Sequence, residues 1–334
     1  MNLPYDALLI VSYGGPERRE DVMPFLENVL RGKAVPEARK WEVAEHYYHF
    51  GGVSPINQQN RELIAALQEL FSSQGPQLPI YWGNRNWHPF LHDTVRRMVQ
   101  DGIRRALAFV TSAYGSYSGC RQYLEDIGRA RAAVGSDAPR IDKIRLFYNH
   151  PGFIAANVAR VREALGELPE GEREGAPLVF TAHSIPVAMA ETSPYVAQLE
   201  ETARLVAEGI GRREFHLAYQ SRSGPPHQPW LEPDVADLLQ EMAGQGVKAA
   251  VVAPIGFISD HMEVLYDLDV ELAAEAQRLG LKMVRAKTVG THPEFVSMVR
   301  ELVLERMNQS PVRRYLGSLG PWPDFCPPDC CRRK

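Results

Sequence analysis

The stretch Ala7-Leu8-Leu9-Ile10-Val11-Ser12-Tyr13-Gly14-Gly15-Pro16 decides the fold class. It begins with an unbroken apolar run, which is typical of a strand that is covered on both faces of its sheet. Small and polar residues follow the run directly. Glycines at such a place let the backbone approach a ligand closely, and Pro16 can open the next helix. The stretch therefore predicts a buried strand with a candidate binding loop at its carboxyl end.

Similar apolar runs recur along the chain. They occupy residues 80–82, 106–110, 178–180 and 249–252. Between the runs, apolar residues recur at helical spacing, as in Val158, Val161 and Leu165 after Pro151. Strands and helices that alternate in this way predict an α/β protein whose parallel sheets are built from βαβ units.

The length of 334 residues favours two domains. A boundary is expected just before Pro151, because the residue before a proline is pushed out of the helical conformation and a new helix can start there. We expect an N-terminal domain over residues 1–148, a second domain over 149–310 and a cysteine-containing tail over 311–334. The last helix of the second domain, about 292–308, can pack back on the first domain.

The composition excludes several classes of protein. Hydrophobic residues make up 45% and charged residues 23%, which is ordinary globular usage. The formal net charge of −4 gives no general attraction to nucleic acid. The first residues show neither a basic region nor a secretory cleavage site, and no run of about 18 apolar residues predicts a membrane span. We therefore expect a cytoplasmic protein without a nucleic-acid partner.

His183 follows the apolar run 178–180 closely and is a candidate site residue, because ligands of open α/β sheets bind outside the carboxyl ends of the strands. Its imidazole could take a proton or bind a metal near neutral pH. On position alone, a structural histidine explains it equally well. The loops after the strands lack the G-x-G-x-x-G and G-x-x-x-x-G-K patterns, which disfavours the common nucleotide-binding versions of the fold.

Three carboxylates form a stripe further along the chain. Glu263, Asp267 and Glu271 stand at positions i, i+4 and i+8 in a segment of helical pattern that begins near Asp260. A solvated acidic face is one explanation. Because Glu263 is set among apolar residues after a predicted strand and loop, the stripe also suits the capture of a divalent cation by oxygen ligands.

The chain has four cysteines, at Cys120, Cys326, Cys330 and Cys331. They are too few for a disulfide framework in a chain of this length, and cysteines in a reducing compartment more often bind metal. Four thiolates equal one Cys₄ site for zinc or for an iron–sulfur cluster. Incidental thiols in a disordered tail are the alternative. The site is favoured, because clustered cysteines have little packing use in a proline-rich terminus.

Five motifs, taken in order, resemble the ferrochelatase family. They are SYGGP at 12–16, GGVSPI at 51–56, TAHSIP at 181–186, YQS at 219–221 and GFISDHME at 256–263. The resemblance covers nearly the whole chain. It implies two similar domains, each with a four-stranded parallel sheet flanked by helices, and a cleft between them. It also implies a lyase of heme biosynthesis that inserts Fe²⁺ into a porphyrin.

The resemblance assigns roles to residues of the second half of the chain. His183 and Glu263 match the catalytic pair that faces the porphyrin and takes its protons or ligates iron. Asp267 and Glu271 match outer carboxylates that relay or hold a second metal. An enzyme for this reaction has to hold the ring distorted, supply a base and deliver a dehydrated cation.

Residues of the first half match the porphyrin-binding positions of the family. Tyr13 resembles the tyrosine of the branch that acts on coproporphyrin III, whereas the protoporphyrin branch usually has an aliphatic residue there. Arg31, Ser54 and Tyr123 match residues that hold the propionates, for which a guanidinium and hydroxyls are suited. His46 stands where the branch often has an arginine.

The resemblance thus implies that coproporphyrin III and Fe²⁺ are the substrates and coproheme is the product. A protoporphyrin IX enzyme, a relative that loads cobalt or nickel into a more reduced tetrapyrrole, and a non-enzymatic binder of porphyrin or iron are the alternatives. We also expect a monomer that makes transient contact with a coproheme decarboxylase.

Some ferrochelatases carry a [2Fe–2S] cluster on one internal and three C-terminal cysteines. Cys120, Cys326, Cys330 and Cys331 match this plan, and the adjacent pair Cys330-Cys331 departs from the usual spacing.

Overall fold

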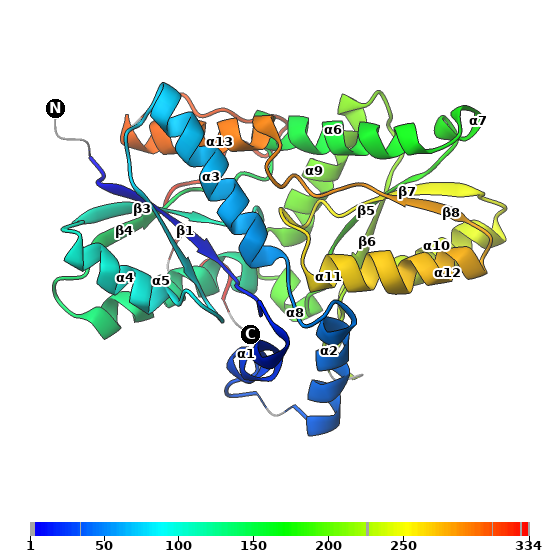
Figure 1. Ribbon diagram of the computed structural model, residues 1–334. Coiled ribbons are helices and arrows are strands. Elements are labelled where there is room, and N and C mark those ends of the chain that lie inside the picture. Colours follow the sequence, from blue (N-terminus) through cyan, green and yellow to red (C-terminus); the bar gives the residue numbers. More distant parts are fainter. Residues whose placement is uncertain (1–3, 34, 225–226, 309, 328, 333–334) are drawn as a thin grey trace. The chain divides into compact units, whose positions relative to one another are not determined.

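The computed structural model divides into two compact units, each of which has its own parallel sheet (Figure 1). It describes residues 4–33, 35–224, 227–308, 310–327 and 329–332. The first unit consists of Met1–Thr111, Gln122–Ile144 and Val299–Pro311. The second unit consists of Ser112–Arg121, Arg145–Met298 and Val312–Lys334.

Within the described residues, the sheet of the first unit has four parallel strands in the order β2-β1-β3-β4. The strands are β1 (Ala7–Ser12), β2 (Ile80–Asn84), β3 (Arg105–Val110) and β4 (Arg140–Lys143). The helices are η1 (Arg19–Asp21), α1 (Val22–Val29), α2 (Glu37–His49), α3 (Ile56–Gln74), α4 (Leu91–Gln100) and α5 (Gln122–Val134).

The second unit repeats this order, as β6-β5-β7-β8, in its described part. The strands are β5 (Leu178–His183), β6 (His216–Gln220), β7 (Ala249–Ala253) and β8 (Lys282–Arg285). The helices are η2 (Tyr117–Arg121), α6 (Pro151–Glu167), α7 (Glu170–Arg173), α8 (Val187–Ala190), α9 (Tyr195–Gly209), α10 (Val235–Gly244), α11 (Met262–Val264), η3 (Leu265–Leu272) and α12 (Ala273–Arg278). The chain passes between the units more than once, and one of these boundaries falls inside α13 (Pro293–Met307).

The predicted α/β class with four-stranded parallel sheets is confirmed, and the shared strand order locates the candidate sites. In each unit the first strand, β1 or β5, lies between the second and third strands of that unit. The strand order therefore reverses beside β1 and beside β5, and open α/β sheets bind ligands at such a switch point. Tyr13 follows β1, and His183 is the last residue of β5.

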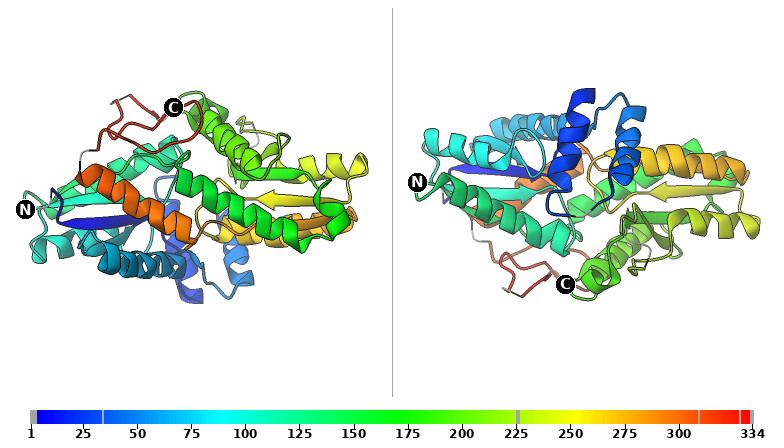
Figure 2. Two further views of the ribbon diagram at one scale, coloured as in Figure 1. Left: turned by 90° about the horizontal axis from the view of Figure 1, so that it is seen from above. Right: turned by 90° about the horizontal axis from the view of Figure 1, so that it is seen from below.

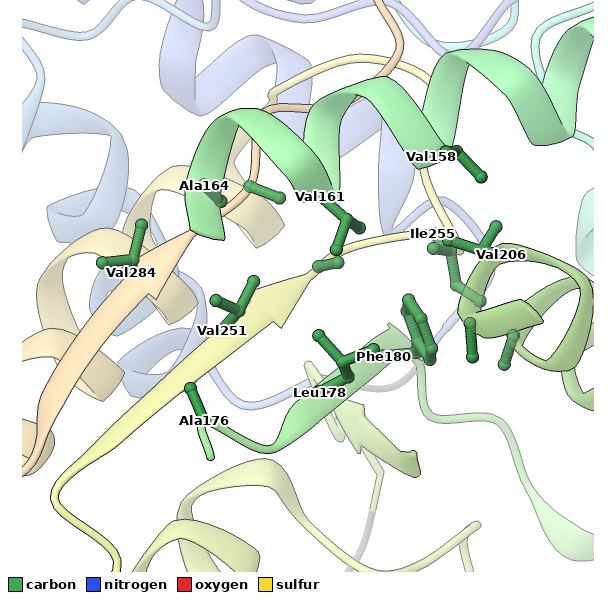
Figure 3. Packing of buried hydrophobic residues seen from close by; sticks show 14 of the residues in the cluster. Val158, Val161, Ala164, Ala176, Leu178, Phe180, Val206, Val251, Ile255 and Val284 are labelled. Carbon is green, nitrogen blue, oxygen red and sulfur yellow. The ribbon is translucent and has the colours of Figure 1, made fainter. Parts of the chain in front are cut away.

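The sheet of the second unit is covered on both faces, which explains why its strands read as unbroken apolar runs. Val251 of β7 belongs to a core shared with α6 and α9 (Figure 3). Its neighbour Val252 belongs to a core shared with α10 and α12. The views from above and below show α6 and α12 on opposite faces (Figure 2). Burying one such valine contributes about 2 kcal/mol.

The start of α6 lies where the sequence predicts it. His150 caps this helix by accepting a hydrogen bond from the Gly152 N–H at 3.2 Å, and Pro151 occupies the first turn. Among the described helices, none combines the length and the apolar character needed to cross a bilayer.

Candidate active site

His183 lies at the carboxyl end of β5, held by its backbone and by one ring nitrogen. Its carbonyl accepts a hydrogen bond from the Tyr195 hydroxyl at 2.9 Å, and its Nδ1 contacts the carbonyl of Ser184. A carbonyl partner requires that Nδ1 carries the proton, so Nε2 is the nitrogen that faces the site. The loop after β7 passes close by, because a Cβ on Gly256 would lie 2.5 Å from the Cβ of Ala182.

Glu263 faces this nitrogen. Its Oε1 lies 3.4 Å from His183 Nε2, and the two side chains keep 45% and 29% of their surface exposed, so a ligand can reach both. Burial by itself lowers the pKa of His183, but the Glu263 carboxylate raises it to about 9. Burial raises and His183 lowers the pKa of Glu263, and the balance is a lowered pKa. At neutral pH the pair is therefore an imidazolium beside a carboxylate.

His261 is a second imidazole on the same carboxylate. Its Nδ1 accepts a hydrogen bond from the Glu263 N–H at 3.2 Å and lies 3.7 Å from Glu263 Oε2. Burial lowers the pKa of His261, so this ring is neutral at neutral pH. Glu263 thus lies between one charged and one neutral imidazole.

Asp267 projects from the π-helix η3, and Ser221 at the end of β6 donates a hydrogen bond to it. The pKa of Asp267 is raised to about 7, because burial and the charges of Glu263 and Glu271 together outweigh the Ser221 hydrogen bond. Ser221 has a φ of 62°, a left-handed conformation that is uncommon outside glycine and that concentrates at functional sites.

The three carboxylates form the stripe that the sequence predicts, but the helix under them differs. The sequence predicts an α-helix from near Asp260, whereas the structure has a short α11, then η3 as a π-helix, then α12. π-Helical turns are rare and occur frequently at functional sites. The stripe runs from half-buried Glu263 to exposed Glu271, and both of these charges act on Asp267 between them.

The first unit brings Tyr13 and Tyr123 to one buried arginine. The Arg85 guanidinium lies 3.7 Å from the centroid of the Tyr123 ring and 6.0 Å from that of Tyr13. Arg85 also forms an ion pair with Asp126, and both side chains are buried. Two of the predicted porphyrin-binding residues thus share a cationic neighbour.

Ser54 and Arg31 lie near the same strand end. Ser54 is buried, its N–H donates to the carbonyl of Pro16 at 2.8 Å, and a Cβ on Gly15 would lie 2.7 Å from the Cβ of Ser54. The exposed Arg31 donates to Asn28 Oδ1 at 2.5 Å. Asn28 in turn donates to the carbonyl of Asn86, whose N–H bonds to the carbonyl of Tyr13.

Comparison with known proteins shows to which family the chain that carries this site belongs. The model of the family described as ferrochelatase matches residues 5–307. A ferrochelatase from Rhodopirellula baltica is 56% identical over 332 residues, which cover 98% of this chain and 93% of the relative. The chain belongs to the ferrochelatase family. A coproporphyrin III ferrochelatase from Streptomyces griseus is 51% identical over 350 aligned positions, which cover 98% of this chain and 93% of the relative.

Solved structures agree with this family on the fold. SirB from Bacillus subtilis superposes with a TM-score of 0.55 at 15% identity, covering 91% of this chain and 97% of SirB. CbiX, described as the terminal enzyme of siroheme biosynthesis in denitrifying bacteria, gives a TM-score of 0.51 at 15% identity, covering 89% of this chain and 98% of CbiX. The predictions of a chelatase fold and of a metal-inserting lyase are confirmed.

Three residues of this ferrochelatase site carry no role in the sequence analysis. His261 and Ser221 lie inside or beside the quoted motifs, and Arg85 follows directly after β2. Inspection of the residues after each strand, the rule that found His183, would have found Arg85 had the end of β2 been placed correctly.

Three of the four cysteines of the chain lie together in the tail. The sulfurs of Cys330 and Cys331 are 3.4 Å apart, and the Trp322 indole N–H donates to Cys326 Sγ at 3.4 Å. Burial and, after it, the neighbouring thiols of Cys331 and Cys326 together raise the pKa of Cys330 to about 12. Cys120 is buried in η2. In the described part of the chain, no three His, Cys, Asp or Glu side chains are arranged to hold a metal ion.

Proposed function

We propose that the chain inserts Fe²⁺ into coproporphyrin III and releases coproheme. One observation carries the proposal: the His183–Glu263 pair stands at the switch point of its sheet, within reach of a ligand, in a chain of the ferrochelatase family. Close relatives that bear the name coproporphyrin III ferrochelatase support the choice of porphyrin.

The reaction requires bases beside the incoming metal. A free porphyrin carries two pyrrole N–H protons, and both leave as Fe²⁺ forms bonds to the four ring nitrogens. The Glu263 carboxylate can take such a proton or hold the iron before its transfer, and His183 Nε2 can do so once the imidazolium has released its own proton.

The carboxylate stripe gives protons or iron a route between this pair and solvent. Asp267 is half-buried next to Glu263, and Glu271 is exposed at the far end. Carboxylate oxygens are the ligands that hard divalent cations prefer, and carboxylates also pass protons through hydrogen-bonded neighbours. The stripe is therefore assigned to metal delivery or proton release.

The first unit is assigned to the porphyrin. Coproporphyrin III has four carboxylates, and Arg31, Ser54 and Tyr123 offer a guanidinium and hydroxyls that hydrogen-bond to carboxylates. Tyr13, on the loop after β1, offers a phenol to the metal centre.

Purified protein, mixed anaerobically with Fe²⁺ and either coproporphyrin III or protoporphyrin IX, tests the proposal. The Soret band and the loss of porphyrin fluorescence report metal insertion. We expect faster turnover of coproporphyrin III. Faster turnover of protoporphyrin IX would overturn the choice of substrate, and porphyrin binding without insertion would favour a non-enzymatic binder.

We also propose that the cysteines hold a [2Fe–2S] cluster, and the number and chemistry of the thiols support this. Cys330 Sγ lies 3.4 Å from Cys331 Sγ, and Cys326 lies close enough to Cys330 to interact with its thiol. Cys120 stands two residues after Ser118, whose hydroxyl donates to Met189 Sδ at 4.0 Å, and three residues after Met189 the Thr192 hydroxyl donates to the carbonyl of Arg332, next to Cys331, at 3.4 Å. When bound, the cluster would cross-link the tail to η2.

An absorption spectrum, together with iron and acid-labile sulfide analysis of protein purified without oxygen, tests the cluster. Cys120→Ser and Cys326→Ser should each abolish it, whereas a wild-type protein without sulfide would exclude it. The monomeric state and the contact with a decarboxylase stay predictions.

A further inference from the structure

Arg285, the last residue of β8, grips the segment that carries the carboxylate stripe. Its guanidinium donates to Asp269 at 2.6 and 2.8 Å and to Asp260 Oδ1 at 3.0 Å. The Arg285 side chain is only 14% exposed, whereas those of Asp260 and Asp269 keep 21% and 34% of their surface, so the arginine is mostly buried and its partners are half-buried. A bidentate hydrogen bond between arginine and a carboxylate fixes the orientation of the two side chains as well as the distance between them.

The two carboxylates that Arg285 binds are not those of the stripe. Asp260 precedes Glu263 by three residues, and Asp269 stands between Asp267 and Glu271. The arginine therefore holds the backbone on both sides of Glu263 without pairing with the stripe itself.

The segment that carries the stripe requires stabilising contacts from outside for two reasons. Neighbouring like charges repel, and Glu263, Asp267 and Glu271 are neighbours along one face. The residues from Leu265 to Leu272 also adopt a π-helix, whose i→i+5 pattern is rare and competes with the ordinary α-helical pattern. A return to α-helix would turn Asp267 and Glu271 relative to Glu263.

A second set of contacts holds the segment from β6, the outer strand on the opposite side of the sheet from β8. Gln220, the last residue of β6, donates a hydrogen bond to the Glu263 carbonyl, and Ser221 donates to Asp267. The segment is thus fastened from the ends of β6 and β8. Arg285 is the member of this arrangement that carries a charge and binds two points at once.

We infer that Arg285 is a positioning residue for metal insertion, which keeps the π-helical stripe aligned with His183 and Glu263. This inference rests on the proposed function, because it concerns how the same site uses iron. It predicts that a change at Arg285 alters the handling of Fe²⁺ and leaves porphyrin binding unchanged.

Arg285→Gln, compared with Arg278→Gln, tests the inference. Arg278 lies on the following helix α12 and pairs with Glu275, which makes it a matched control for the loss of one arginine from an ion pair. For Arg285→Gln we expect kcat over KM for Fe²⁺ to fall about 10-fold to 100-fold, the range for residues that orient metal ligands. The dissociation constant for coproporphyrin III, measured by fluorescence quenching, should not change, and Arg278→Gln should match the wild type.

Asp269→Asn is the second variant, because it removes the bidentate hydrogen bond and keeps Arg285. It should reproduce the loss in iron use, and amide hydrogen exchange over residues 262–272 should accelerate in both variants but not in Arg278→Gln. Wild-type handling of Fe²⁺ in a folded Arg285→Gln or Asp269→Asn, or equal losses in iron use and porphyrin binding, would overturn the inference. An inactive wild type would instead overturn the proposed function.

Discussion

The two sheets of this member of the ferrochelatase family share one strand order, but different kinds of side chain lie at the carboxyl ends of their first strands. The carboxyl end of β1 leads to Tyr13, and the carboxyl end of β5 carries His183, at equivalent switch points. At the first, Arg85 lies against tyrosine rings, so the groups there are hydroxyls and a cation. At the second, imidazole faces the Glu263 carboxylate. The same backbone plan thus offers donors for carboxylates in one unit and bases for protons and metal in the other.

The two switch points share a close backbone approach and differ in the side chains around it. At both switch points a backbone approach is so close that a Cβ would clash: Gly15, after β1, lies against Ser54, and Gly256, on the loop after β7, lies against Ala182 of β5. Close approach is therefore a property of this strand-end geometry. The chemistry depends on the side chains that are placed around it, and substitutions in the two units should separate accordingly.

His183→Ala should give the largest effect. Loss of a base or ligand in contact with the reacting atoms should reduce metal insertion by about 100-fold to 10,000-fold, while coproporphyrin binding persists. Insertion rates and fluorescence titrations measure the two quantities. His216→Ala is the control, since His216 is exposed at the opposite end of the neighbouring strand β6. Unchanged insertion in His183→Ala would remove the catalytic role from the second unit.

Arg31→Ala should impair porphyrin binding and leave the metal-insertion step intact, the reverse of His183→Ala. Removal of a guanidinium from a carboxylate should raise KM for coproporphyrin III about tenfold, which corresponds to about 1.4 kcal/mol, and should leave kcat at saturating porphyrin unchanged. Arg39→Ala on α2 removes an equally exposed arginine that pairs with Glu42 and serves as the control. A loss confined to kcat would contradict the division of labour between the units.

Glu271→Ala should have a smaller effect, confined to iron. The exposed end of the stripe raises the local concentration of cations, so KM for Fe²⁺ should rise about threefold to tenfold. Glu275→Ala is the matched control, because Glu275 lies four residues further on and pairs with Arg278. An unchanged dependence on Fe²⁺ concentration would speak against delivery along the stripe.

The central strands of each sheet and the outer strand β2 are predictable from sequence, whereas the outer strands β4, β6 and β8 are not. Val251 and Val252 of β7 pack into different cores, so burial on both faces leaves an unbroken apolar signal. The outer strands β4 and β8 read RIDK and KMVR, short and polar, because a strand at the edge of a sheet pairs on one side and meets water at its ends. No apolar run marks them, and Arg285 therefore escapes notice in the sequence.

The candidate site also has features that are predictable from sequence and features that are not. The spacing of Glu263, Asp267 and Glu271 suffices to place three carboxylates on one stripe. The π-helix beneath them is not predictable from spacing, since it depends on contacts from Gln220, Ser221 and Arg285, which lie far away in sequence. Local periodicity thus identifies the groups, and tertiary contacts determine how they are presented.

The smallest expected effect concerns stability, and it separates the second unit from the first. The pKa of His183 is raised to about 9, so its ion pair with Glu263 stabilises the fold fully below the unfolded pKa of about 6.5 and is lost as the pH rises through about 9. Because both side chains are partly exposed, the contribution is at most about 1 kcal/mol.

Glu263→Gln should therefore lower the free energy of unfolding by up to about 1 kcal/mol at pH 6 and by almost nothing above about pH 9.5. Urea unfolding at several pH values measures this difference. In the first unit, Asp101→Asn breaks the pair of Asp101 with Arg97, and neither of those groups titrates between these pH values, so its effect should stay constant. A Glu263→Gln effect that is equally independent of pH would show that the pair is not ionised, and the contrast between the two switch points would then rest on hydrogen bonding alone.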